Sequence, residues 1–246
     1  MKRVGIVVFP GSNCEHDVAE AVAVAGMEPH LLWHADQSLG PVDAVVLPGG
    51  FAHGDYLRPG AIARFSPVMA AVGEFARSGG PVVGICNGFQ VLTEAGLLPG
   101  ALRQNQALKF ICTRVMTRVD SSASALTANV PVGTVLELPI NHFSGSYTCL
   151  PETLDELRAE GRIILRYVEN PNGSIDDIAG ICNVEGNVVG LMPHPERACD
   201  PLGSEDGLGL WTSLSGWPGA QAGPPARRIP ALRSTEGSTP ASRQAL

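Results

Sequence analysis

The strongest constraint on the fold of this chain comes from residues 81–95. Here a short apolar run leads into a cysteine, which is followed by a helical pattern. Residues 81–85 are almost entirely apolar and follow two glycines, as is typical of a strand buried on both faces. Residues 87–95 have helical spacing, so Cys86 is expected at a strand-to-helix turn. Gly84 and Gly88 lie two residues to either side and let neighbouring backbone approach closely, which predicts a nucleophile elbow.

The position of Cys86 at this turn favours a reactive thiolate. A helix that begins there directs unpaired N–H groups and a partial positive charge toward the sulfur. The alternative is a buried and inert core cysteine, because free cysteines usually pack as small hydrophobic residues. From this segment alone, both interpretations of Cys86 remain open.

The first 95 residues alternate between strand and helix patterns. Strands are expected at 3–9, 29–34, 42–47 and 81–85, and helices from a Ser12/Glu15 capping box to about 25, at 61–77 and at 87–95. Such alternation predicts a mostly parallel, doubly wound sheet that is flanked by helices. The third strand ends in the glycine-rich turn 48–51, which is therefore expected at the ligand-binding edge of the sheet.

Strand patterns dominate from Lys109 onward. Strands are expected at 110–119, 132–139, 163–169, 178–182 and 187–192, with a polar loop at 141–147 and a helix at 151–160. The sequence Glu185-Gly186-Asn187 between the last two strands predicts a β-hairpin. The expected fold class is therefore α/β, with a mostly parallel sheet and a smaller antiparallel β portion in the second half.

Composition sets the expected domain limits and surroundings of the chain. Residues 1–214 are expected to form one domain, and 215–246, which are rich in Pro, Gly, Ser and Ala, a disordered tail. The net charge of −7 argues against nucleic acid as the main partner. The six cysteines include no C-x-x-C pair, and neither a leader pattern nor a membrane-spanning apolar run is present. We therefore expect a cytoplasmic protein with reduced thiols and no membrane contact.

His194 has the best context for a general base among the six histidines. Pro193 and Pro195 favour an extended chain here, in which His194 and Glu196 would point the same way. Glu196 would then orient the imidazole, so that Cys86, His194 and Glu196 form a catalytic triad. The alternative for the tetrapeptide 193–196 (PHPE) is a surface turn with a solvated charge.

Attack of a thiolate on an amide also requires two N–H donors for the oxyanion. The backbone of Asn87 is expected to supply one donor, and the turn at Gly50 and Phe51 the other. His53 and His142 lie in segments that could reach a substrate. Packed or solvated roles are expected for the other three histidines, His16, His30 and His34. No phosphate-binding loop or metal-ligand motif occurs, so we expect neither nucleotide nor metal on this chain.

Together these motifs resemble the class I (triad) glutamine amidotransferases, whose domain is flavodoxin-like. The resemblance at that level is carried by residues 84–88 (GICNG) and 194–196 (HPE). Further segments resemble a narrower family, the glutaminase subunits of phosphoribosylformylglycinamidine synthases. These segments are 9–14 (FPGSNC), 49–51 (GGF), 54–58 (GDYLR), 86–90 (CNGFQ), 170–174 (NPNGS), 178–183 (IAGICN) and 190–197 (GLMPHPER).

The resemblance implies a reaction and its partners. Cys86 would attack the side-chain amide of glutamine, ammonia would leave, and water would hydrolyse the thioester to glutamate. Ammonia would pass to a separate ATP-dependent synthetase subunit, which converts formylglycinamide ribonucleotide to the amidine in purine biosynthesis. ATP and Mg would bind to that partner, and a small accessory subunit could belong to the same complex. The expected substrate-binding residues are Gln90, Asn141, His142 and Phe143.

Two segments depart from the usual pattern of this family. Ala52 and His53 replace a Ser-Tyr pair, and 141–145 (NHFSG) replaces Ala-His-Gly-Glu-Gly. Because the triad residues are all present, these differences bear on substrate or partner contacts. Two alternatives remain, namely an amidotransferase subunit of a different synthetase and a noncatalytic binding module of the same fold.

Overall fold

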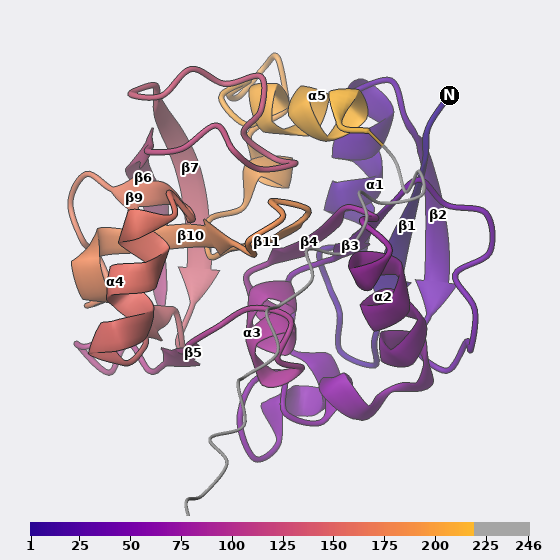
Figure 1. Cartoon of the computed structure of the whole chain (residues 1–246), viewed down its shortest axis with the longest axis horizontal. Helices are drawn as coiled ribbons and strands as arrows, with labels where there is room; N and C mark the ends of the chain where they lie inside the picture. The colour runs from indigo at the N-terminus through magenta and orange to yellow at the C-terminus, as the bar shows by residue number, and fades with distance from the viewer. Residues whose placement is uncertain (219–246) are drawn as a thin grey trace, which may run out of the picture.

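The computed structural model describes residues 1–218, and its N-terminal half alternates strands with helices as expected (Figure 1). The strands are β1 (Arg3–Val8), β2 (Glu28–Trp33), β3 (Ala44–Leu47) and β4 (Val82–Ile85), and the helices are α1 (Glu15–Val24), α2 (Pro67–Arg77) and α3 (Asn87–Glu94). Short 3-10 turns η1 (Ala52–Asp55) and η2 (Ala63–Phe65) lie between β3 and α2. The strand, elbow and helix around Cys86 are confirmed.

The second half is mainly β structure. Its strands are β5 (Ala101–Arg103), β6 (Ile111–Val119), β7 (Val135–His142), β8 (Ser146–Thr148), β9 (Ile163–Tyr167), β10 (Ile178–Cys182) and β11 (Val188–Leu191). Two helices, α4 (Pro151–Ala159) and α5 (Leu208–Gly216), and two 3-10 turns, η3 (Ile175–Asp177) and η4 (Pro195–Arg197), complete the described chain. The hairpin expected around Gly186 is confirmed by the antiparallel pairing of β10 with β11.

One nine-stranded sheet runs through both halves in the order β2-β1-β3-β4-β11-β10-β9-β6-β7. The first five strands of this order are parallel, and the pairs from β11 onward are antiparallel. The predicted α/β class is thus confirmed, although the antiparallel portion continues the main sheet. A separate small sheet pairs β5 with β8.

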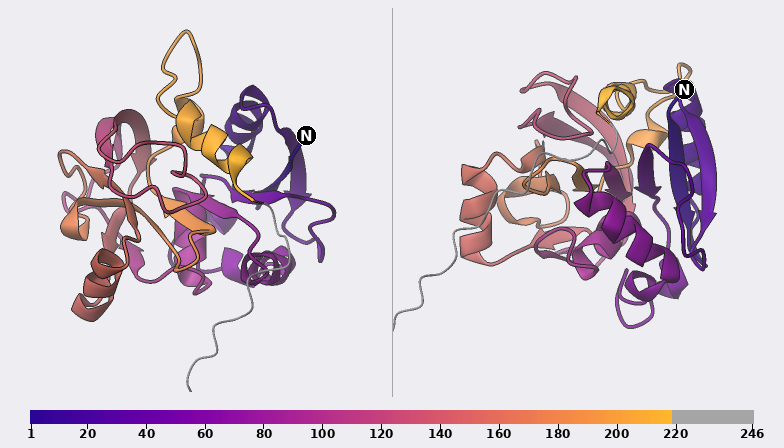
Figure 2. Two further views of the ribbon diagram at one scale, coloured as in Figure 1. Left: turned by 45° about the horizontal axis from the view of Figure 1, so that its top comes forward. Right: turned by 45° about the vertical axis from the view of Figure 1, so that its right-hand side comes forward.

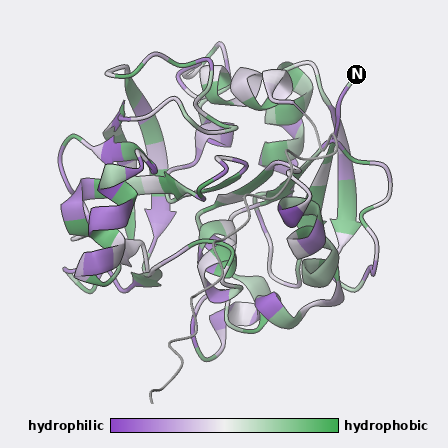
Figure 3. Ribbon diagram, in the orientation of Figure 1, coloured by the Kyte–Doolittle hydropathy of each residue, from purple (hydrophilic) through white to green (hydrophobic). Residues whose placement is uncertain are grey.

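The central strands β3, β4 and β11 are buried along their whole length. Helices α1 and α5 lie on one side of them and α3 on the other, as Figures 1 and 2 show. Figure 3 shows these strands in the colours of hydrophobic residues, whereas the outer face of α4 is hydrophilic. Because β3, β4 and β11 are parallel neighbours in register, the segments that follow them meet at one edge of the sheet.

Two expected helix features were wrong. The helix expected at 61–77 is interrupted, because Pro67 disfavours a helical conformation at the residue before it and Ser66 is extended. The capping box was also wrong, since the Ser12 hydroxyl accepts a hydrogen bond from the Phe9 N–H at 3.0 Å and Cys14 is the N-cap of α1. Ser12 therefore stabilises the turn after β1.

The domain boundary expected at residue 214 stays a prediction, and helix α5 runs past this residue. Helix α5 includes Ser215 and continues to Gly216, and its Trp211 and Leu214 side chains are fully buried. Trp217 packs against the core as well. The remainder of the expected disordered tail, residues 219–246, lies outside the described residues.

Candidate active site

Cys86 lies at a strained corner between β4 and α3. Its backbone has φ 50° and ψ −104°, and positive φ is uncommon for residues other than glycine. The Cys86 N–H donates to the Leu191 carbonyl at 2.8 Å, which fastens the corner to β11. A side chain at Gly88 would lie 1.9 Å from the Leu47 carbonyl oxygen, so only glycine fits there. The close backbone approach expected of an elbow is present.

His194 and Glu196 form a buried pair beside this corner. Their side chains are 1% and 0% exposed, and His194 Nδ1 lies 2.6 Å from Glu196 Oε1. Burial alone would lower the pKa of His194, but the Glu196 carboxylate and the neighbouring Cys86 and Cys14 thiols raise it well above its ordinary value. The alternative of a solvated surface turn is therefore wrong.

The local geometry of this pair differs from the extended chain that we expected. Pro195 begins the 3-10 turn η4, and this turn brings Glu196 back toward the imidazole. When His194 Nδ1 donates to Glu196, Nε2 carries the lone pair. This Nε2 atom is buried and has no hydrogen-bond partner among residues 1–218. It is therefore the ring atom that can take the proton of the Cys86 thiol, and the raised pKa of His194 favours the imidazolium that results.

The environment of the Cys86 sulfur includes the opposite wall of the site. The thiol lies 3.8 Å from the Asn141 carbonyl oxygen, which can accept a hydrogen bond from it. Cys86 is only 5% exposed but borders a cavity of about 770 Å³. A small substrate can therefore approach the sulfur from the cavity.

The expected oxyanion donors need one correction. The Phe51 N–H donates to the Gly11 carbonyl at 2.8 Å, so it is not available to a substrate. Gly50 and Asn87 keep unpaired N–H groups in the described chain, the latter because it is the first residue of α3. Gly50 has φ 146°, and a Cβ there would lie 2.8 Å from the backbone of Asn13. Glycine is therefore required in this turn.

All four residues expected to bind substrate line the cavity: Gln90, Asn141, His142 and Phe143. The Gln90 amide is already engaged, since Nε2 donates to the Ser144 carbonyl at 2.6 Å and Oε1 accepts from Asn87 at 2.9 Å. Gln90 thus ties α3 to the segment after β7. This segment was expected to be a loop from residue 141, but Asn141 and His142 extend strand β7 by pairing with β6.

His142 anchors the cavity wall. Its Nδ1 lies 3.1 Å from Asn105 Oδ1, and the ring fills the space where a side chain at Gly145 would lie. Burial, together with the charge of His194, lowers the pKa of His142 to about 4, so the ring is neutral. His53 does not line the cavity, because its ring packs 5.3 Å from that of His34.

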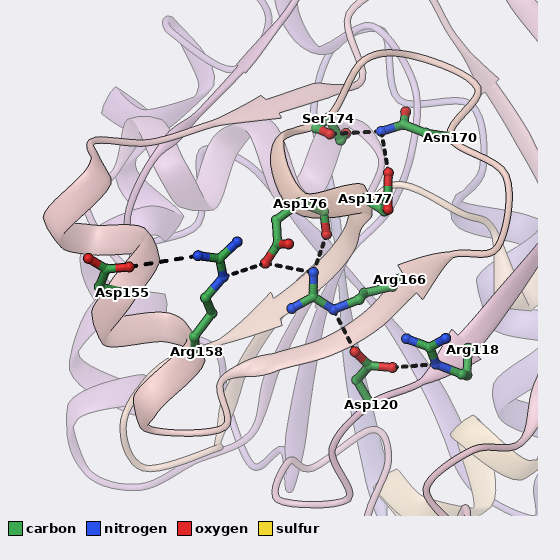
Figure 4. A network of polar contacts seen from close by, with 9 residues as sticks. All are labelled: Arg118, Asp120, Asp155, Arg158, Arg166, Asn170, Ser174, Asp176 and Asp177. Carbon is green, nitrogen blue, oxygen red and sulfur yellow. Dashed lines mark hydrogen bonds and ion pairs between the residues drawn. The ribbon is translucent and has the colours of Figure 1, made fainter.

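A polar network supports this wall from behind, and the sequence patterns did not indicate it. Asn172 Nδ2 donates to the Gly145 carbonyl at 2.9 Å. The segment that carries Asn172 is held in turn by ion pairs from Arg158 and Arg166 to Asp176 at 2.8 and 2.7 Å, as Figure 4 shows. The only sequence signal for this role was the family motif at 170–174.

Cys14 was also missed as part of the site. One donor atom each from Cys14, His194 and Glu196 lie within 4.8 Å of one another, which is close enough to consider a metal site. However, Arg197 donates to Cys14 Sγ at 3.2 Å, and His194 and Glu196 are bonded to each other. The Arg197 guanidinium next to the sulfur would repel a metal cation. The cluster is better explained as packing of Cys14 against the buried His194–Glu196 pair.

Comparisons with known proteins identify relatives along most of the chain. Residues 1–207 match the family described as CobB/CobQ-like glutamine amidotransferase domain. A protein from Rubrobacter xylanophilus named phosphoribosylformylglycinamidine synthase subunit PurQ is 61% identical over 86% of this chain and 97% of its own length. A protein of the same name from Frankia casuarinae is 55% identical over 87% of this chain and 94% of its own length.

Solved structures agree with these matches. A chain in the structure of PurLQS from Thermotoga maritima is 42% identical, with a TM-score of 0.82 over 88% of this chain and 99% of that one. A glutamine amidotransferase from Thermotoga maritima shares the fold, at 17% identity and a TM-score of 0.52 over 79% of this chain and 76% of that one. None of the helices within residues 1–218 combines the length and the apolar character needed to cross a membrane.

Proposed function

Because this chain belongs to the CobB/CobQ-like glutamine amidotransferase family, and within it to the PurQ subunits of phosphoribosylformylglycinamidine synthase, we propose that it releases ammonia from glutamine through a Cys86–His194–Glu196 triad. The observation that carries this proposal is the buried hydrogen bond of 2.6 Å between His194 and Glu196 beside the Cys86 elbow. A carboxylate in this position fixes the tautomer of the base and stabilises its protonated form.

The first half of the reaction forms a thioester. His194 Nε2 takes the thiol proton, and Cys86 Sγ attacks the side-chain amide carbon of glutamine. The N–H groups of Gly50 and Asn87 stabilise the resulting oxyanion. The tetrahedral intermediate collapses as the leaving nitrogen receives the proton from His194, and ammonia departs.

The second half regenerates the thiol. His194 takes a proton from a water molecule, whose oxygen attacks the thioester carbon. The same N–H groups stabilise the second oxyanion, the C–S bond breaks, and the proton returns to sulfur. Glutamate is released, so the net reaction is the hydrolysis of glutamine to glutamate and ammonia.

Ammonia is delivered to an ATP-dependent synthetase subunit that converts formylglycinamide ribonucleotide to the amidine. ATP and Mg bind to that subunit, not to this chain, and a small accessory subunit completes the complex. In support, four large hydrophobic side chains at the cavity are exposed: Phe51 (44%), Leu57 (85%), Leu108 (66%) and Phe143 (38%). A clustered apolar rim of this kind is typical of a protein interface. The free cysteines support a cytoplasmic location.

The test is glutamate release from glutamine by this chain, alone and with the synthetase subunit, formylglycinamide ribonucleotide and ATP. We expect the partner to stimulate hydrolysis and Cys86→Ala to abolish it. Cys112→Ala is the matched control, because Cys112 is exposed on β6 and should leave hydrolysis unchanged. Hydrolysis that survives in Cys86→Ala contradicts the proposed triad.

The same experiment separates the two alternatives. No stimulation by this synthetase, with Cys86 still alkylated by a glutamine-like electrophile, indicates a subunit of a different synthetase. Absence of selective alkylation indicates a noncatalytic binding module.

A further inference from the structure

Two oppositely charged side chains on the cavity wall have no ionic partner within residues 1–218. The charged residues that line the cavity are Asp55, Arg58 and Arg103. Arg58 is already occupied, since its Nε and Nη2 atoms lie 2.5 and 2.7 Å from the carboxylate of Glu94. None of the ion pairs among residues 1–218 includes Asp55 or Arg103. The cavity in front of Cys86 therefore offers one free carboxylate and one free guanidinium.

Asp55 is held close to the reaction centre. Its Oδ1 atom accepts a long hydrogen bond of 3.4 Å from Asn87, the residue that follows the nucleophile. Burial raises the pKa of Asp55 to about 6, and the hydrogen bond from Asn87 opposes this only partly. A half-buried carboxylate without a cation is unfavourable, and a cationic ligand would relieve that cost.

The backbone around Asp55 also indicates a positioned group. His53, Asp55 and Leu57 all have positive φ values, of 54°, 54° and 70°. Such conformations persist only where surrounding contacts enforce them, and they concentrate at ligand-binding segments. The turn that follows Gly50 thus places this carboxylate on the cavity wall at a conformational cost.

Arg103 comes from a different wall of the same cavity. It is the last residue of β5, which pairs with β8 and packs against α3 (Figure 1). The next residues along the chain, Gln104 and Asn105, line the cavity as well. The backbone of Arg103 is therefore held in place by β8 and α3, whereas its guanidinium group has no ionic partner among residues 1–218.

We propose that Asp55 binds the α-ammonium group and Arg103 the α-carboxylate of glutamine, so that the site selects a free α-amino acid. The inference rests on the proposed function, because the γ-amide must reach Cys86 at the same time. A zwitterionic head group carries one cation and one anion, which matches the two unpaired charges. Arg can bind a carboxylate through two parallel N–H bonds, and charged hydrogen bonds of this kind are the stronger ones.

The test compares glutamine with two analogues that each lack one charge. 4-Carbamoylbutanoate lacks the ammonium group, and 4-aminobutanamide lacks the carboxylate. Ammonia release is measured with the chain in complex with its synthetase subunit, for wild type, Asp55→Asn and Arg103→Gln. Arg114→Gln is the control, since Arg114 pairs with Glu137 away from the cavity and should behave as wild type with all three substrates.

We expect Asp55→Asn to raise KM for glutamine by about 10- to 100-fold with a smaller change in kcat. It should leave kcat/KM for 4-carbamoylbutanoate unchanged, because that substrate has no ammonium group to lose. Arg103→Gln should lower kcat/KM for glutamine and for 4-carbamoylbutanoate to a similar extent. It should leave kcat/KM for 4-aminobutanamide unchanged. This selectivity distinguishes a direct contact from a structural role.

The inference is overturned if Asp55→Asn lowers kcat/KM for glutamine and for 4-carbamoylbutanoate equally. It is also overturned if either variant has the wild-type kcat/KM for glutamine. The first outcome would mean that Asp55 only supports the elbow, and the second that the charges face the partner subunit. The rate of Cys86 alkylation by iodoacetamide in each variant reports whether the elbow is intact. Failure of the proposed function would give a different result, because ammonia release would then survive in Cys86→Ala.

Discussion

Gly49→Ala tests whether catalysis depends on the position of the imidazole. A Cβ at Gly49 would lie 2.7 Å from His194 Cε1 and 3.0 Å from Cys14 Sγ. Ordinary contact begins at 3.4 Å, so the ring must move by about 0.7 Å to accept the methyl group. A displacement of this size at a catalytic base costs on the order of 10²-fold in rate.

The effect on folding should be smaller. Overpacking of this kind destabilises a protein by about 1–3 kcal/mol, which corresponds to a few degrees in Tm for a chain of this length. We therefore expect Gly49→Ala to remain folded at 25 °C and to lose about 10- to 100-fold in kcat for glutamine hydrolysis.

The assay is steady-state glutamate release with the synthetase subunit present, together with thermal denaturation. Gly203→Ala is the matched control, because the nearest atom to a Cβ there is 3.8 Å away. Wild-type kcat in Gly49→Ala would refute the reasoning, since the imidazole would then tolerate the shift. A loss of activity that only parallels a loss of folded protein would refute it as well.

Three further predictions follow from the geometry of the site. As pH falls through about 6, Asp55 becomes protonated and can no longer pair with an ammonium group, so KM for glutamine should rise; Asp55→Asn should flatten this rise in a pH series. Glu196→Gln removes the negative charge that holds His194, and kcat should fall by about 10²- to 10⁴-fold while Cys86 can still be alkylated; near wild-type kcat would exclude the carboxylate from the triad. Arg166→Met breaks two largely buried ion pairs behind the cavity wall. It should lower the free energy of unfolding by about 1–3 kcal/mol in denaturant titrations. An unchanged free energy of unfolding would show that the network in Figure 4 does not stabilise the wall.

Much of the fold was predictable from the sequence because its signals are local. The apolar runs at β1, β3, β4 and β11 and the helical spacing after Cys86 depend only on neighbouring residues. The interruption before Pro67 was predictable too, but the expectation of one helix over 61–77 did not take this proline into account. Strand β5 and helix α5 were missed, since β5 has three residues and the burial of α5 depends on distant partners.

Local signals were enough to identify the residues that could perform the chemistry. Cys86, His194 and Glu196 each lie in a recognisable context, namely an elbow or a proline-flanked turn, and the parallel sheet brings the ends of β4 and β11 together. Local patterns cannot say which backbone N–H group is already paired. Only long-range contacts established that Phe51 donates to Gly11 and that the wall containing His142 is held from residues far along the chain.

The same holds for the charges of the cavity. Asp55 and Arg103 are separated by almost fifty residues, and nothing in their own neighbourhoods indicates that both face one cavity. Side-chain periodicity assigns residues to faces of single elements, whereas a binding site is formed by faces of several elements at once. Long-range packing therefore decided which charges lie together without partners and could serve a ligand.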